Sequence, residues 1–170
     1  QVVDRPRPRL RNDTLAKNYG GIAAVAAAGV RLTRLDLGVK PAKFEFLCVR
    51  VVSGSSSCVV AIIYRPGSER VTSAFFDDLS DVLDRVAAFV DPVFVVGDVN
   101  VRLDRPTGSN AIRFADILAA HGLVSCVSPV THARGGTLDV VAVRGDLRQP
   151  HVDVLDVGLS DHRLLLWPAS

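Results

Sequence analysis

The sequence predicts an α/β layered domain, in which strands and helices pack as separate layers. Dense β-branched runs come early in the chain, and 57–64, SCVVAIIY, is the clearest of them. An amphipathic stretch at 73–91 follows, and a short, continuously apolar strand at 93–96 comes directly after it. Paired strands followed by alternating helices and strands are typical of a layered α/β domain.

The first half of the domain is predicted to consist mainly of strands. One strand is expected at 20–28, where two glycines open an apolar run, and another at 43–52, KFEFLCVRVV. Between 43–52 and the strand at 57–64, the residues 53-SGSS-56 predict a hairpin turn, because glycine and small residues favour tight turns between strands.

The second half is predicted to alternate helices with strands. Between 73 and 91 the apolar residues recur at spacings of three and four, which indicates an amphipathic helix with Ser73 as its N-cap and Pro92 as its end. A second helix is expected at 110–120, closed by Gly122. Later strands are expected at 137–143, 151–157 and 163–167.

Residues 1–18 are predicted to form an irregular basic arm, and residues 19–170 a single domain. The arm contains 5-RPRPRLR-11, whose alternating Pro and Arg favour an extended backbone. It is either a solvated tail or an arm that contacts phosphate groups.

Composition favours a globular domain with a core of its own. The 170 residues are 48% hydrophobic and 22% charged, and the net charge of +2 is too small to imply a polyanionic partner. The cysteines are Cys48, Cys58 and Cys126, an odd number without a C-x-x-C pair. This pattern favours a reduced intracellular protein over a disulfide framework.

No apolar run is long enough to predict a membrane span, so no membrane partner is expected. The longest candidate, 22–30, is short and is broken by Gly29. The chain has no signal-peptide pattern and no methionine, and we expect it to be a piece of a longer protein.

Polar residues gather where predicted strands end, and they are the candidate site. Tyr64 ends one strand, while Asp98 and Asn100 follow the strand at 93–96. Loops at strand ends are where reactive groups of α/β domains gather. Asp98 could also simply cap a turn, as Asp and Asn often do.

A second group of polar residues lies nearer the end of the sequence. Asp139 interrupts an otherwise apolar strand, and a buried carboxylate without a partner is costly. The imidazole of His162 is a natural partner, because a carboxylate on one ring nitrogen would fix the tautomer. Ser160 and Asp161 belong either to the same site or to an N-cap and turn.

Together these residues offer hard oxygen ligands, an amide, a phenol and a carboxylate–imidazole pair. Hard oxygen ligands suit Mg²⁺ or Mn²⁺, and such an ion could neutralise the charge of a phosphodiester. The imidazole could stabilise a pentacovalent transition state or help to activate water. The sequence has no thiolate ligand set, no G-x-S-x-G elbow and no P-loop pattern.

Four motifs in this order resemble one known family: 62-IIYRPG-67, 94-FVVGDVN-100, 137-TLDVV-141 and 160-SDHRLL-165. The family is the endonuclease/exonuclease/phosphatase superfamily, and the resemblance covers about residues 19–167. The spacing of 20-GGIAAV-25, 131-THARGGTLDVV-141 and 159-LSDHRLL-165 is most similar to the apurinic-like endonuclease domain of non-LTR (LINE-type) retrotransposons.

The resemblance implies a fold and an activity. The family fold is a four-layer α/β sandwich, two β-sheets flanked by helices, and this chain would lack its first strands. The implied reaction is metal-dependent phosphodiester hydrolysis with Mg²⁺ or Mn²⁺, which nicks DNA so that the 3′-OH primes reverse transcription. The implied partners are DNA and a reverse transcriptase domain in the same polyprotein, and the implied location is nuclear.

The resemblance also implies catalytic roles. Asp98 resembles the aspartate that aligns the attacking water, and Asn100 its partner, which also binds phosphate. Tyr64 resembles the tyrosine that contacts the scissile phosphate. His162 resembles the phosphate-binding histidine, and Asp139 the carboxylate paired with it.

Three further residues resemble groups around the phosphate and the metal. Asp161 resembles a residue near the metal, Ser160 a phosphate-neighbouring hydroxyl, and Thr131 a threonine found near the site in this branch. The motif reads GDVN where GDFN is commoner, and Val99 in place of Phe is expected to be a core change without effect on the chemistry.

The chain departs from the family at its principal metal ligand, a glutamate that ends an early strand. Its two glutamates, Glu45 and Glu69, lie at other places in the sequence, so the first strands are expected upstream of residue 1. We therefore expect this chain alone to bind Mg²⁺ weakly and to cut DNA poorly. Two alternatives stay open: a non-catalytic fragment or relic, and a phosphoesterase of the same fold that acts on lipid or inositol phosphates.

Overall fold

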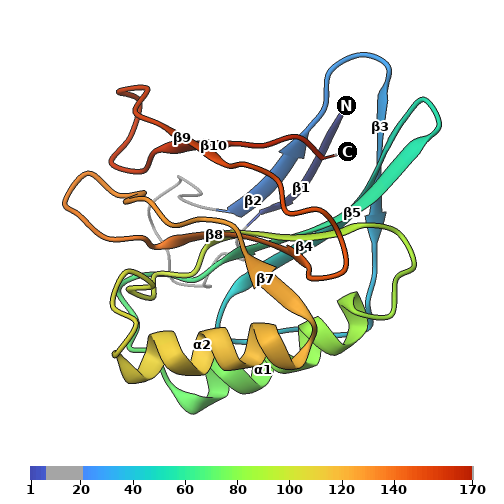
Figure 1. Cartoon of the computed structure of the whole chain (residues 1–170). Coiled ribbons are helices and arrows are strands. Elements are labelled where there is room, and N and C mark those ends of the chain that lie inside the picture. Colours follow the sequence, from blue (N-terminus) through green and yellow to red (C-terminus); the bar gives the residue numbers. More distant parts are fainter. Residues whose placement is uncertain (7–20, 170) are drawn as a thin grey trace, which may run out of the picture.

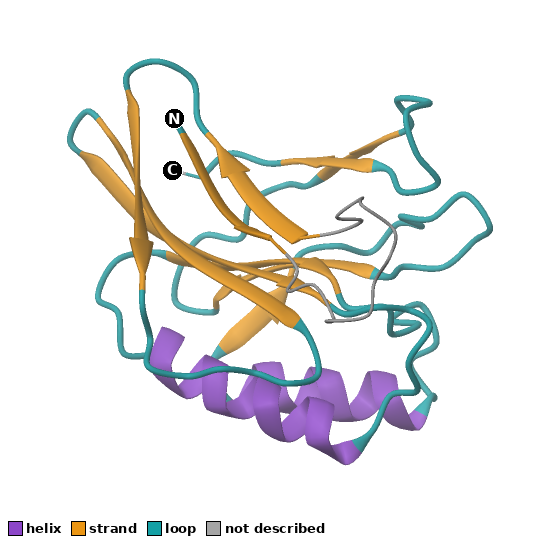
Figure 2. Ribbon diagram, turned by 180° about the vertical axis from the view of Figure 1, so that it is seen from behind, coloured by secondary structure: helices purple, strands orange, loops and turns teal. Residues whose placement is uncertain are grey.

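A computed structural model describes residues 1–6 and 21–169, and it has the mixed α/β architecture that the sequence predicts. A six-stranded sheet lies at the centre, with two helices on one side and two small two-stranded sheets on the other (Figure 1). Figure 2 shows the same separation of helices and strands from behind.

The central sheet is mixed and has the strand order β3-β4-β5-β6-β8-β7. Its strands are β3 (Val30–Leu35), β4 (Glu45–Ser53), β5 (Ser56–Tyr64), β6 (Val93–Asp98), β7 (Leu123–Ser125) and β8 (Asp139–Arg144). Only β5 and β6 are parallel, and the other neighbours are antiparallel. The β4–β5 hairpin turns at Gly54, which has a φ of 58° and confirms the predicted turn.

Helices α1 (Ser73–Val86) and α2 (Ser109–Ala120) cover one face of the central sheet (Figure 1). The predicted apolar stripe of α1 is buried up to residue 86, where it packs on side chains of β5 and β6 such as Ala61 and Val95. Burial of this stripe is the main source of stability for a helix of this length, because its backbone hydrogen bonds alone are marginal in water.

Helix α1 ends at Val86, five residues before the predicted end, and its N-cap is Thr72 rather than Ser73. The reason for the early end is tertiary. Asp91 accepts hydrogen bonds from Arg50 and Ser57, which lie on β4 and β5, so the chain leaves the helix to reach the sheet. Val90, which the helical pattern included, is 93% exposed.

The second β layer consists of two antiparallel pairs, β1 (Val2–Pro6) with β2 (Gly21–Val25), and β9 (Asp153–Leu155) with β10 (Leu164–Leu166). Ile22 of the first pair packs on β4, while Leu165 of the second packs on the half of the sheet that contains β6 and β8. Within the described residues no helix covers the outside of this layer, so these residues account for three layers.

Three strands of the structure are absent from the sequence prediction. Residues 2–6 of the predicted irregular arm form β1, because Val3 packs into the core cluster under β2. Residues 30–35 form the edge strand β3, and residues 123–125 form the short edge strand β7. The rest of the predicted arm, residues 7–18, lies outside the described residues.

Neither helix of the described residues has the length and apolar character that a membrane crossing requires.

Gly97 provides a test of the sheet geometry. A Cβ at this position would lie 2.0 Å from the carbonyl oxygen of Ile63, and the φ of Gly97 is +128°. Gly97→Ala is therefore expected to lower the free energy of unfolding by about 3 kcal/mol or more, since overpacking and backbone strain add. Chemical denaturation measures the loss. Gly29→Ala is the control, because Gly29 has a φ of +88° but open space around it; equal losses in the two variants would contradict the close approach.

Candidate active site

Strand register brings three polar residues onto one face of the central sheet. Tyr64 of β5 lies beside Asp98 of β6, and Asp98 lies beside Asp139 of β8. Side chains alternate along a strand, and Val96 and Val141, two residues away on β6 and β8, pack on the side opposite the helices. The three polar side chains therefore point toward the layer of small sheets.

The fourth member, His162, comes from that opposite layer, just before β10. Its Nδ1 lies 3.0 Å from Oδ2 of Asp139, and its Nε2 lies 3.6 Å from Oδ2 of Asp98. The contact that the sequence led us to expect between His162 and Asp139 is present. The two carboxylates are 13% exposed and the imidazole 30% exposed, so the cluster is partly shielded from water.

The environment shifts the pKa of both His162 and Asp98. Burial lowers the pKa of His162, but the hydrogen bond to Asp139 and the nearby carboxylate charges outweigh it, so the pKa of the ring is raised. Burial raises the pKa of Asp98 to about 6, the charge of Asp139 adds to the rise, and the backbone N–H of Asn100 opposes it. The site can therefore hold a protonated imidazole beside a carboxyl group that ionises near neutral pH.

Asn100 fixes the direction of the Asp98 carboxylate. Its side-chain amide donates to Oδ2 of Asp98 at 2.7 Å and to the carbonyl of Arg65 at 2.8 Å, while its backbone N–H donates to Oδ1 of Asp98. The φ of Asn100 is +49°, a conformation that Asn tolerates better than most residues. Gly67 lies against this amide, and a Cβ there would be 2.8 Å from Oδ1 of Asn100.

Arg65 holds the loop that follows β6. The side chain is buried, and its guanidinium donates to the carbonyls of Pro66, Glu69, Val99 and Asn100 at 2.6–3.1 Å. The backbone N–H of Arg65 also donates to the carbonyl of Asp98. The motif 62-IIYRPG-67 contains this arginine, but its role depends on the contact between the loop after β5 and the loop after β6, which the sequence alone does not show.

The structure places Thr131, which is predicted to lie near the phosphate, in the core beside the start of β8. Its side chain is fully buried, and Oγ1 accepts hydrogen bonds from the backbone N–H groups of Leu138 and Asp139. Thr131 therefore holds the start of β8 in place and so positions Asp139. Ser160 is exposed, but its hydroxyl is engaged in a local turn with the backbone of His162.

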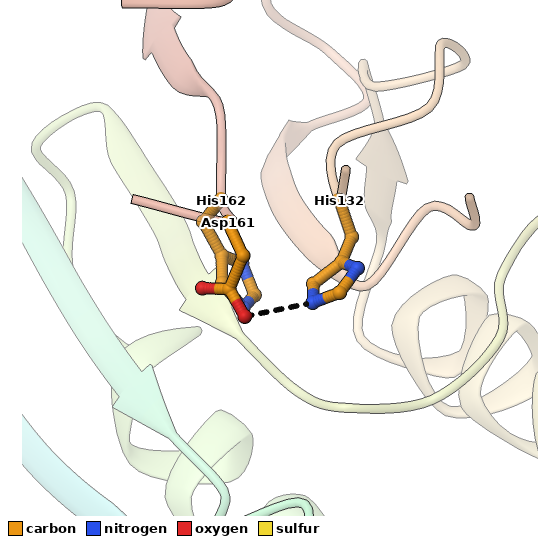
Figure 3. A group of neighbouring side chains, drawn as sticks. All are labelled: His132, Asp161 and His162. Atoms are coloured by element: carbon orange, nitrogen blue, oxygen red, sulfur yellow. Dashed lines mark ion pairs between the residues drawn. The ribbon is translucent and has the colours of Figure 1, made fainter. Parts of the chain in front are cut away.

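Asp161 and His132 extend the cluster on the side of the loop before β8 (Figure 3). Oδ2 of Asp161 lies 3.3 Å from Nε2 of His132, and the rings of His132 and His162 meet edge to face with centroids 4.9 Å apart. Sequence reasoning singled out the neighbouring Thr131 but missed His132. The available signal was its place next to Thr131 in 131-THARGGTLDVV-141.

The donor set fits a divalent cation. Two carboxylates and an imidazole, from Asp98, Asp139 and His162, have ligand atoms within 4.8 Å of one another, and Asp161 with the two histidines forms a second such group. The pKa of Asp98 is raised chiefly by burial and further by the charge of Asp139, and a cation bound there would offset both effects. Carboxylate oxygens are what Mg²⁺ and Mn²⁺ prefer.

Comparison with known proteins identifies a family. The sequence pattern of the Endonuclease/Exonuclease/phosphatase family matches residues 9–162, and its members are generally metal-dependent hydrolases of phosphate esters. No curated protein matches the chain.

Several solved structures share the fold at low sequence identity. The endonuclease domain of TRAS1, a telomere-specific non-LTR retrotransposon, is 13% identical, with a TM-score of 0.68 over 95% of this chain and 75% of that one. The Neisseria 3′ phosphatase NExo, bound to a product DNA hairpin, is 16% identical, with a TM-score of 0.61 over 99% and 78%. The human Nocturnin catalytic domain is 20% identical, with a TM-score of 0.58 over 99% and 72%.

The raised pKa of Asp98 predicts a pH-dependent effect of Asp98→Asn. The folded value of about 6 exceeds the usual value of about 4, so the wild type loses stability as pH rises through 6 and the Asp98 carboxyl ionises. The variant should be more stable than the wild type by about 1–3 kcal/mol at about pH 8, and similar to it at about pH 4. Denaturant unfolding at both pH values measures this difference.

Asp146→Asn serves as the control, because Arg144 lowers the pKa of Asp146 and the sign is opposite. A gain for Asp98→Asn that is the same at both pH values would show that its charge is not destabilising.

The four hydrogen bonds of the Arg65 guanidinium predict that Arg65→Lys destabilises the fold, although the substitution keeps the positive charge. A lysine ammonium cannot donate to four carbonyl oxygens at once, so we expect the free energy of unfolding to fall by about 2–4 kcal/mol. Arg70→Lys in the same loop is exposed and should change it by less than about 0.5 kcal/mol. Denaturant unfolding compares the two variants, and equal stability would show that the hydrogen bonds of Arg65 to these carbonyls do not stabilise the fold.

Proposed function

The chain belongs to the endonuclease/exonuclease/phosphatase family, and on that premise we propose that it is the metal-dependent, DNA-nicking endonuclease domain of a non-LTR retrotransposon polyprotein. The observation that carries the proposal is the position of His162 between Asp139 and Asp98. A phosphodiester bound there would meet a hydrogen-bond donor and a base within one partly shielded cluster.

Each residue of the cluster has a chemical task in this proposal. Nδ1–H of His162 donates to Asp139, which leaves Nε2 to donate to a phosphate oxygen and to stabilise charge in the transition state. Asp98, held by Asn100, is ionised above a pH of about 6 and can orient the attacking water and accept its proton. Tyr64 stands next to Asp98 in the register, where its phenol can contact the same phosphate.

A divalent ion, Mg²⁺ or Mn²⁺, would supply Lewis-acid neutralisation of the phosphate charge. Asp161 and the neighbouring carboxylates are the residues that would hold it. The family fold in which such sites occur is a four-layer α/β sandwich, and we infer that the three described layers are part of it.

The support for DNA as the substrate is the similarity of the fold to proteins that are described as acting on or binding DNA. TRAS1 is by its name a retrotransposon endonuclease, and NExo is described with a product DNA hairpin. The proposed retrotransposon origin, and not these structures, implies a reverse transcriptase domain in the same polyprotein as the partner and the nucleus as the place of action.

Plasmid nicking tests the proposal. The wild-type chain should convert supercoiled DNA to open circles with Mg²⁺ or Mn²⁺, and chelation should stop it. The rate should be low, because neither glutamate stands in the place of the family's principal metal ligand. His162→Ala should lower the rate by about 100-fold or more, because it removes the donor to phosphate. The control is His151→Ala, since His151 is 87% exposed and belongs to a separate pair with Asp153.

The outcomes distinguish the alternatives. Full activity in His162→Ala would refute the assignment of the site. Hydrolysis of inositol or lipid phosphates in place of DNA would favour another phosphoesterase of the same fold. DNA binding that weakens with salt, without any metal-dependent cutting, would indicate a non-catalytic relic.

A further inference from the structure

His132 occupies a constrained place beside the proposed catalytic histidine (Figure 3). His132 and His162 form an isolated β-bridge, and their rings meet at 89°. The side chain of His132 is only 14% exposed, and its Nε2 lies 3.3 Å from the carboxylate of Asp161. Backbone hydrogen bonds from Ala133 to Asp161 and from Arg163 to Thr131 hold this loop against the segment before β10.

The hydrogen bonds of His132 assign its tautomer. The backbone N–H of Arg134 donates to Nδ1 of His132 at 3.1 Å. A ring nitrogen that accepts a hydrogen bond carries no proton, so the proton of the neutral ring resides on Nε2, which lies 3.3 Å from Oδ2 of Asp161.

This tautomer decides between two roles for His132. The ring lies among possible metal ligands, because Asp161 and His162 present ligand atoms within 4.8 Å of it. A protonated Nε2 has no lone pair for a metal. If the proton moved to Nδ1, then Nδ1–H and the N–H of Arg134 would face each other as two donors without an acceptor, which is unfavourable.

We propose that His132 is a positioning residue and not a metal ligand: it orients the carboxylate of Asp161 through Nε2–H and supports the ring of His162 by its edge-to-face contact. The kinetic part of the inference rests on the proposed function. The tautomer part does not, because it follows from the hydrogen bond that Nδ1 of His132 accepts.

Nitrogen NMR of the histidine rings tests the tautomer without any activity. The ring signals of His132, assigned by their loss in His132→Gln, should show the Nε2–H tautomer at neutral pH. Titration with Zn²⁺, a diamagnetic probe with a high affinity for imidazole, should leave that pattern in place. An Nδ1–H tautomer, or coordination of Zn²⁺ by His132, would overturn the proposal whether or not the protein cuts DNA.

Three variants then separate the contacts of His132. His132→Gln keeps a donor toward Asp161, His132→Asn keeps only an acceptor for the N–H of Arg134, and His132→Phe keeps only the ring. The ring signals of His162 should shift in the Asn and Phe variants, and kcat for nicking should fall by about 10- to 100-fold with little change in KM. The Gln variant should retain more of the wild-type kcat than the other two, because it keeps the donor toward Asp161 although it loses the ring contact with His162.

His151→Gln is the matched control, since its Nε2 also lies 3.3 Å from an aspartate, Asp153, but is exposed. Equal kcat losses and equal His162 shifts in all three His132 variants, or wild-type values in all three, would overturn the positioning role. A wild type that does not nick DNA would refute the proposed function, while the NMR shifts of His162 would still decide the role of His132.

Discussion

Asp139 carries a carboxylate into the interior of the molecule, and the imidazole of His162 is the group that offsets its charge. An isolated buried carboxylate would be costly, so the pair constrains both elements that supply it. Asp139 is fixed by the register of β8 on β6. The segment before β10 in the second β layer must therefore place His162 directly over Asp139. The distance between the two layers is thus coupled to the geometry of the site.

The same strand register explains why the other polar residues are where they are. Asp98 lies directly between Tyr64 and Asp139 across three neighbouring strands, so a shift of one residue in either pairing would turn a carboxylate to the helix face. The apolar residues that precede Asp98 on β6 are buried on both faces and resist such a shift. Core packing therefore maintains the strand register that aligns Tyr64, Asp98 and Asp139.

Departures from ordinary folding rules gather around Asp98. Gly97 allows a backbone approach that no side chain permits, Asn100 adopts a positive φ, and Arg65 is a buried cation held by main-chain carbonyls. Each of these features costs conformational or desolvation free energy. Contacts within and between the loops that follow β5 and β6 offset these costs. Such local conflicts are expected where a protein holds reactive groups in one orientation.

The sequence by itself determined the element types and the residues of the candidate cluster. Period-two and apolar runs predicted β4, β5, β6 and β8, the period of the apolar residues predicted α1, and polar residues at strand ends marked Asp98, Asn100 and Asp139. These signals are local, because each depends on which face of one element meets the core. The costly burial of Asp139 was enough to indicate His162 as its partner.

Only the tertiary structure decided what depends on distant contacts. The end of α1 follows from Asp91 reaching β4 and β5, and the strand β1 exists because β2 pairs with it. Thr131 proved buried, and the place of His132 came from a loop folded against His162. No local pattern encodes these relations, because the free energy of each depends on groups that come together only when the layers pack.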